Sequence, residues 1–412
     1  MYKILSLDGG GSWAILQLLT LKERFRVEIP GLKGHDILRQ FDLIIANSGG
    51  SIVLAALAEN MTIDQAIHLF DEKETRERIF SKNSYKESFW PVTLTRLFSF
   101  GPKYSSKRKG KAFAQIFPKC HSMLMNELPD FIGKPNLKLI VCTYDALNNR
   151  AKFFRSYPQG NAGWEYVKLT QAIHGSSNAP VQYFDFPARF KAKGSNIFYE
   201  LWDGALGGFN NPAVAGIIEA FRVQVPLEEM VLISIGNGNK LMSMADKENF
   251  FEIKSITIKE RFKKLNFFSY KFQFQYFKQT VLNQAKTILY EPPDWSSFVA
   301  LMFLSKKAAE IDAVSFIRLS PLIHIDGKTH PSVVPLLEKL YALDMDLTED
   351  SEISLIKECF EKWKNGAIQN QPIHFEVQRN NDLVYHFGDE WFENAMDKWM
   401  GLDQKNTEKN EE

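Results

Sequence analysis

Two glycine-containing turns near the amino terminus constrain the fold of this chain most strongly. The first is DGGG at residues 8–11 and the second is ANSGG at residues 46–50, and each follows an apolar run of strand length, residues 2–7 and 41–47. The stretch after each turn carries apolar residues at the spacing of an α-helix. Two strand-turn-helix units of this kind are typical of an α/β protein whose parallel strands are joined by helices.

The second turn contains a serine, Ser48. A serine on a tight turn between a strand and a helix is held outward at the carboxyl end of the sheet, and the N–H groups of the next helix point to the same place. Such a turn has no room for large side chains two positions before or after the serine, and Ala46 and Gly50 meet this requirement. The pattern therefore indicates an acyl-transfer site.

A third feature lies far downstream, where the strand-like run 196–202 ends at Asp203 in a loop rich in glycine and asparagine. Asn211 and Pro212 then have the residue types that begin a helix. Burial raises the pKa of a carboxyl group towards neutral pH, which suits an aspartate to act as a general base for a nearby serine. A serine paired in this way needs no histidine.

Together these motifs resemble the patatin-like phospholipase family. SLDGGG resembles the family's oxyanion loop, ANSGGS its nucleophile elbow and WDGALGGFNNP its aspartate motif, and further similar segments lie at 144–158, 172–184 and 231–239. The resemblance covers residues 1 to 320 and implies that Ser48 is the nucleophile and Asp203 the base of a Ser-Asp dyad. It also implies that the backbone N–H groups of Gly9, Gly10 and Gly11 form the oxyanion hole, with no cofactor and no metal.

The activity that this resemblance implies is hydrolysis of carboxylic esters in membrane lipids, of the phospholipase A or lysophospholipase type. Two residues depart from the family pattern, and these departures bear on which class of substrate the protein accepts. The family usually has a basic residue where this chain has Trp13, and glycine where it has Ala46. The Ala46 change adds one methyl group, whereas the loss of a cation at position 13 removes a group that could hold the loop or attract a phosphate.

We expect a three-layer patatin-like α/β fold with a mainly parallel central sheet and a helical carboxyl-terminal part. Predicted strands are 2–7, 41–47, 137–145, 196–202 and 231–235, joined by helical crossovers. The acyl hydrolase domain is expected at 1–325, a helical extension packed on it at 326–400, and a disordered polar tail at 401–412.

Composition narrows the class of protein. The net charge of +1 over 412 residues does not indicate a nucleic-acid partner, and three widely spaced cysteines fit a reducing compartment. The sequence contains no apolar run long enough for a membrane-spanning helix. A strand that begins at residue 2 leaves no room for a cleaved signal peptide. We therefore expect a cytoplasmic protein acting on phospholipid or another acyl lipid through peripheral membrane contact, with signal-independent export left open.

Residues 247–278 interleave aromatic with basic side chains. Such a segment suits a lipid surface, because aromatic rings settle at the headgroup level and lysines meet anionic lipid. It equally suits a cover over the core whose lysines extend to water.

Several alternatives stay open at the level of sequence. His324, His330, His374 and His386 follow Asp203 in the order of a Ser-His-Asp esterase. The same loop that contains Gly9 and Gly11 loosely matches a dinucleotide fingerprint, although no acidic residue ends a clear second strand. The histidines and aspartate of HIDGKTH at 324–330 suggest a metal site, but the run lacks a third clear ligand. A catalytically weak or inactive module that binds membranes or partners is a further alternative.

Overall fold

The computed structural model describes residues 1–27, 29, 31–82, 102–158, 165–180, 183–194, 196–240, 294–305, 315–378 and 382–411. The aromatic and basic segment 247–278 lies outside the described residues.

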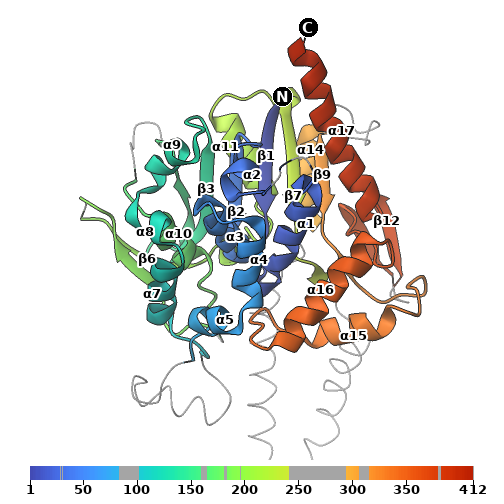
Figure 1. The fold of residues 1–412 in the computed structure, drawn as a ribbon, viewed down its shortest axis with the longest axis horizontal. Helices are drawn as coiled ribbons and strands as arrows, with labels where there is room; N and C mark the ends of the chain where they lie inside the picture. Colours follow the sequence, from blue (N-terminus) through green and yellow to red (C-terminus); the bar gives the residue numbers. More distant parts are fainter. Residues whose placement is uncertain are drawn as a thin grey trace, which may run out of the picture.

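A mixed sheet forms the centre of the described structure (Figure 1). It has eight strands in the order β5-β6-β3-β2-β1-β7-β9, and β4 also pairs with β3. Strands β3, β2, β1, β7 and β9 are parallel, which confirms the mainly parallel sheet that the sequence predicts. The bounds are β1 (Tyr2–Leu7), β2 (Leu43–Asn47), β3 (Lys138–Asp145), β4 (Arg150–Arg155), β5 (Ala188–Lys191), β6 (Phe198–Asp203), β7 (Met230–Ile235) and β9 (Phe316–Leu319).

Helices cover both faces of this sheet, as expected for three layers. Successive residues of β1 and β2 point to opposite faces, so Ile4 and Ile45 pack against α11 and α14 while Leu5 and Ala46 pack on the other side. This second face is covered by helices from both ends of the chain. The helices are α1 (Ile15–Phe25), α2 (Gly34–Leu38), α3 (Ser48–Ala58), α4 (Ile63–Asp71), α5 (Lys73–Ile79), α7 (Ser106–Ile116), α8 (Pro118–Ser122), α9 (Leu128–Ile132), α10 (Leu169–Ser176), α11 (Ala213–Arg222), α14 (Asp294–Leu304), α15 (Val334–Ala342), α16 (Asp350–Lys364) and α17 (Phe392–Glu411), with short 3₁₀ helices η1 (Gly11–Ala14), η2 (Met125–Glu127), η4 (Gly204–Gly207) and η5 (Leu227–Glu229).

One strand runs against the expected direction. The predicted strand at 196–202 is β6, which is antiparallel to β3 instead of following a helical crossover. The reason is its connection to β5: β5 runs in the same direction as β3, and β5 and β6 form a hairpin that turns near Gly194, whose φ is +69°. A short hairpin connection can only return the chain in the antiparallel direction.

The carboxyl-terminal part packs along the side of the sheet that carries β7 and β9 (Figure 1). Trp363 of α16 and Trp399 of α17 are buried in the same hydrophobic cluster as the helices α1 and α3. This part is not purely helical, because β11 (His374–Val377) and β12 (Leu383–Phe387) form a separate antiparallel sheet and β10 (Leu322–Ile323) pairs with β8 (Asn239–Lys240). The helix α17 continues to Glu411, through most of the tail for which the sequence predicts disorder. The division of the chain into domains stays a prediction.

None of the helices in the described ranges combines the length and the apolar character that crossing a lipid bilayer requires.

Candidate active site

Two strands of opposite direction meet end to end along β3. The first part of β3 pairs with β2, whose last residue Asn47 lies opposite Cys142. The next residue of β3, Thr143, lies opposite Asp203, the last residue of β6. Because β4 occupies the other edge of β3, β2 and β6 share one edge and their carboxyl ends face each other. This arrangement brings residues 48 and 203 together although they are far apart in the sequence.

Ser48 lies on a strained turn between β2 and α3. Its φ of +47° is in the left-handed region, which few residues other than glycine adopt and which is common at functional sites. The Ser48 amide donates to Ser176 Oγ at 2.8 Å. The small residue predicted at position 50 is required, since a side chain on Gly50 would meet the carbonyl oxygen of Leu7 at 2.5 Å.

The hydroxyl of Ser48 donates a short hydrogen bond to Asp203. Its Oγ lies 2.6 Å from Asp203 Oδ2. The other carboxylate oxygen, Oδ1, accepts from Asn47 Nδ2 at 3.1 Å and from the Ala205 amide at 2.9 Å. Burial raises the pKa of Asp203, and these three hydrogen bonds act in the opposite direction. The carboxylate is therefore fixed in orientation and more basic than an exposed one.

The glycine loop after β1 is held by its carbonyl groups. Asn237 Nδ2 donates to the carbonyl oxygens of Asp8 and Gly9, both at 2.9 Å, and Gln17 Nε2 also donates to that of Asp8 at 2.9 Å. The Gly9 amide donates to Asn210 O at 2.7 Å and is thus engaged within the protein. In the part of the chain that the structure describes, the amides of Gly10 and Gly11 donate to no other group.

An ion pair lies beneath this loop. Asp8 Oδ2 is 2.6 Å from Arg318 Nη2, and both side chains are almost completely buried. Arg318 Nη1 also donates to Ser234 Oγ at 2.7 Å. Burial raises the pKa of Asp8 to about 6, against the opposing effect of Arg318. The pair ties the start of the glycine loop to β9.

Trp13, which stands where the resemblance leads one to expect a basic residue, attaches the loop to the segment 343–347 between α15 and α16. Its indole nitrogen donates to Asp344 O at 3.0 Å, and the Ser12 amide donates to Met345 O at 2.9 Å. The Lys240 ammonium lies 4.9 Å from the centre of the Trp13 ring. Trp13 therefore contributes packing at this position, and Lys240 of β8 places a cation beside its ring.

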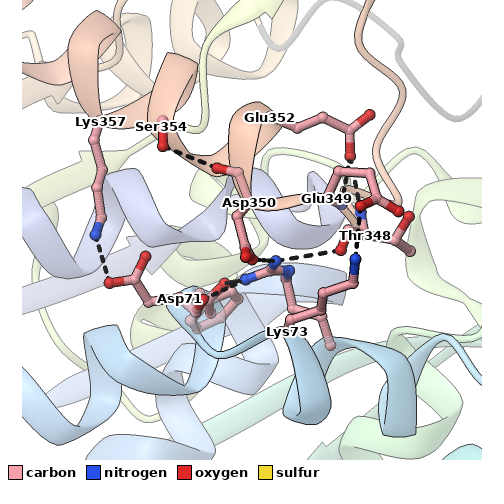
Figure 2. A network of polar contacts seen from close by, with 10 residues as sticks. Asp71, Lys73, Thr348, Glu349, Asp350, Glu352, Ser354 and Lys357 are labelled. Atoms are coloured by element: carbon pink, nitrogen blue, oxygen red, sulfur yellow. Dashed lines mark hydrogen bonds and ion pairs between the residues drawn. The ribbon is translucent and has the colours of Figure 1, made fainter.

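Just after this segment in the chain, ion pairs fix α16 to α4 and α5 (Figure 2). Lys73 bonds Glu349 at 2.7 Å and Lys357 bonds Asp71 at 2.5 Å. Arg76, whose side chain is buried, bonds both Asp350 and the carbonyl oxygen of Thr348. The segment 343–347 is thus held on both sides.

The described residues form three neighbouring clefts that include Ser48 or residues of the glycine loop and of η1. The glycine-loop cleft, about 610 Å³, contains Ser48 and Asp203 and is lined by Asp8, Gly9, Gly10, Trp13, Ala205, Asn210, Asn237, Gly238, Lys240, Arg318, Ser320 and Met345. The lysine cleft, about 330 Å³, also contains Ser48 and is lined by Gly11, Ile52, Ile79, Phe80, Lys109, Ser177, Ala179, Tyr183, Phe184 and Met345. The inner apolar cleft, about 370 Å³, is lined by Gly11, Ser12, Ile52, Leu69, Phe70, Thr75, Arg76, Ile79, Phe80, Ile116 and Phe117.

The structure brings Ser48, Asp203 and the glycine loop together, and none of the four candidate histidines is among the residues that line the two clefts containing Ser48. The hydrogen-bond partners of Asp203 are Ser48, Asn47 and Ala205. His374 and His386 lie on β11 and β12, in the separate sheet. Among the described residues, no group of three His, Cys, Asp or Glu side chains is arranged to hold a metal ion.

Sequence reasoning assigned no role to several residues that build the site. Asn47, Ser176 and Asn237 lie inside the quoted motifs, but their types alone do not say which backbone groups they bind. The sequence does contain a signal for Arg318, because a single arginine interrupts the apolar run FIRL of β9 and such a residue needs a buried partner. Met345 and Lys109 belong to segments whose patterns do not distinguish them.

Comparison with known proteins gives a family and a set of distant structures. A family model described as patatin-like phospholipase matches residues 5–216. No curated protein matches the chain significantly. VipD from Legionella pneumophila is similar in structure with a TM-score of 0.35 and 11% identity, over 87% of this chain and 67% of that chain. The full-length complex of SpcU with ExoU from Pseudomonas aeruginosa gives 0.26 and 15%, over 43% and 38%, and the type III effector ExoU gives 0.24 and 9%, over 86% and 89%.

Proposed function

Because this chain belongs to the patatin-like phospholipase family, we propose that it hydrolyses carboxylic esters of membrane lipids through a dyad of Ser48 and Asp203. The observation that carries the proposal is the 2.6 Å hydrogen bond from Ser48 Oγ to Asp203 Oδ2. A nucleophile within hydrogen-bond reach of a base that is itself oriented by other groups is the arrangement that covalent catalysis needs. Asn47 and the Ala205 amide supply that orientation.

In the proposed reaction Asp203 accepts the proton of Ser48 Oγ as this oxygen attacks the ester carbonyl carbon. Asp203 then returns the proton to the leaving alcohol, and an acyl group remains on Ser48. Water, deprotonated by Asp203, attacks the acyl group and releases the fatty acid. The raised pKa of Asp203 favours each proton transfer to it, because a more basic carboxylate holds the proton more firmly.

The oxyanion of the tetrahedral intermediate would be held by backbone amides of the glycine loop. Gly10 and Gly11 are the better donors, since the Gly9 amide is already bonded to Asn210 O. Donors that are fixed before the reaction stabilise the developing charge without rearranging. The side-chain amides of Asn237 and Gln17 fix this loop through its carbonyl groups.

We propose a phospholipase A or lysophospholipase activity. Ser48 lines both the glycine-loop cleft, which contains polar side chains such as Asn210, Asn237 and Lys240, and the lysine cleft, whose walls are almost entirely apolar. An acyl lipid has the same division, with a polar headgroup on one side of the ester and a hydrocarbon chain on the other. The proposed chemistry needs neither a cofactor nor a metal.

A fluorophosphonate probe, which labels activated serines, tests this function when it is followed by peptide mass mapping and by an assay of fatty-acid release from phospholipid vesicles. The native chain should be labelled at Ser48, and Ser48→Ala should lose both labelling and fatty-acid release while remaining folded. Asp203→Asn keeps the shape but removes the base, so its rate should fall by about 10²- to 10⁴-fold.

Ser51→Ala is a matched control, because Ser51 lies one turn along α3 and its hydroxyl bonds Ser48 O instead of Asp203. It should still be labelled at Ser48. A folded native chain with neither labelling nor fatty-acid release would favour the inactive-module alternative. A collapse of activity in the alanine variant of His324, His330, His374 or His386 would favour the Ser-His-Asp esterase.

A further inference from the structure

A lysine side chain is buried beside the proposed dyad. Lys109 of α7 has no exposed surface. Its ammonium lies 3.8 Å from the centre of the Phe184 ring and 3.4 Å from Ser177 Oγ. Among the described residues, Ser177 Oγ is its one hydrogen-bond acceptor, and Asp203 and Asp185 act on it without a direct bond. An ammonium has three donors, so this one has donors to spare.

A buried cation without an anionic partner is unfavourable, because protein groups do not replace the water that it has lost. Burial accordingly lowers the pKa of Lys109 well below its ordinary value, although Asp203 and Asp185 at longer range act in the opposite direction. The Phe184 ring offsets part of this cost through its contact with the ammonium. A ligand that carries a negative charge would supply the missing partner.

The surroundings of Lys109 define the rest of that ligand. Lys109 and Ser48 line the same lysine cleft, whose other walls are largely apolar. The inner apolar cleft shares Ile52, Ile79 and Phe80 with it, so hydrocarbon contacts continue away from Ser48. One cation at the reactive serine, followed by apolar walls, matches an anionic head on a long alkyl chain.

We propose that the lysine cleft and the inner apolar cleft together bind a long-chain carboxylate, with the carboxylate at Lys109 Nζ and the chain along Ile79 and Phe80. This inference rests on the proposed function, because the carboxylate is the fatty acid that hydrolysis at Ser48 releases. The carbonyl carbon that Ser48 attacks becomes the carboxylate carbon, so the new charge arises beside Ser48 and close to the ammonium. The alcohol product leaves towards the glycine-loop cleft. Lys109 is thus a product-binding residue, and fatty acid competes with new substrate for its cleft.

Calorimetric titration of the full-length Ser48→Ala protein tests this site without requiring turnover. Decanoate, decan-1-ol and acetate are the probes, since they separate the charge from the chain. Decanoate should bind about 10- to 100-fold more tightly than decan-1-ol, as expected for hydrogen bonding to a charged group. Acetate should bind far more weakly than decanoate, because it lacks the chain.

Lys109→Met, added to the same protein, keeps an unbranched apolar side chain and removes the ammonium. It should abolish the preference for decanoate over decan-1-ol. Lys107→Met is the matched control, since Lys107 is an exposed lysine two residues earlier on α7, and it should keep the preference. Phe80→Ala should weaken decanoate and decan-1-ol alike.

Equal binding of decanoate and decan-1-ol to the protein with native Lys109 would overturn the inference, and this comparison holds even if Lys109→Met does not fold. Acetate binding as tightly as decanoate would also overturn it, because the chain would then contribute nothing. Lys109-dependent decanoate binding in a chain without esterase activity would support the site and refute the proposed function. Ser48-dependent hydrolysis without a preference for decanoate over decan-1-ol would support the proposed function and refute the carboxylate site.

Discussion

Asn47 Nδ2 donates to Asp203 Oδ1 at 3.1 Å, so the residue that precedes the proposed nucleophile also orients the proposed base. The contact crosses the point on β3 where β2 and β6 end facing each other. Because Asn47 and Ser48 are consecutive, any shift of β2 along β3 would move both contacts to Asp203 together. The geometry of the dyad therefore depends on strand register as much as on the two side chains.

The pH dependence of activity should report the ionisation of Asp203. Only the carboxylate can accept a proton, and burial raises the pKa of Asp203 above the ordinary value of 3.8. On a soluble ester, kcat/KM should therefore fall as the pH is lowered through a pKa above that value. Asn47→Ala removes a hydrogen bond that lowers this pKa, so the acid limb of its profile should move to higher pH. An acid limb at the same pH in both proteins would assign the titration to another group.

Gly10→Ala should damage catalysis more than substrate binding. Gly10 has a φ of +154°, and a side chain there would meet Asn237 Nδ2 at 2.8 Å, so the loop must shift. Loss of an aligned oxyanion donor lowers kcat by about 10²- to 10³-fold. Gly401→Ala is the matched control, because among the described residues no side chain and no backbone outside its own helix lies within 4 Å of the added methyl group. A loss of binding as large as the loss of kcat would mean that the loop mainly holds the substrate.

The buried pair of Asp8 and Arg318 should contribute strongly to stability as a unit. Asp8→Asn leaves the Arg318 guanidinium buried without its carboxylate, so the free energy of unfolding should fall by about 3 to 5 kcal/mol. Asp8→Asn combined with Arg318→Met removes both charges and should cost less than the two single changes added together. Urea unfolding of the four proteins measures this coupling, and strict additivity would show that the pair does not act as a unit.

The aromatic and basic segment 247–278 should dock the enzyme on anionic membranes. Each lysine near such a surface contributes about 1 kcal/mol of binding. Replacing Lys259, Arg261, Lys263 and Lys264 with glutamine should therefore weaken sedimentation with anionic vesicles, while turnover of a soluble ester survives. Unchanged sedimentation would favour a role as core cover, and loss of both activities with unfolding would show that the segment is structural.

The sequence predicts those parts of the fold that depend on local pattern. The apolar runs of β1, β2 and β7 are buried on both faces, and such runs are recognisable without a structure. The direction of β6 depends on its pairing with β5, which four residues of modest β-propensity do not reveal.

The site residues likewise divide into those that a local sequence pattern predicts and those that only contacts between distant segments bring to the site. Ser48 and the glycine loop stand on turns whose shape requires small residues, so their sequence signal is strong. Arg318, Lys109 and Met345 reach the site only through contacts between elements distant in the chain. No local rule selects them, because an arginine, a lysine or a methionine has many other uses.

The bond between Trp13 and Asp344 joins residues that are 331 positions apart. A chain growing on the ribosome thus carries the serine, the aspartate and the glycine loop well before the segment 343–347 exists to complete their surroundings. Fragments that end before residue 343 have the dyad but lack the wall that Met345 provides. Formation of the finished pocket around the proposed dyad therefore follows the synthesis of segment 343–347, and a fragment without this segment lacks one of the walls that would select the substrate.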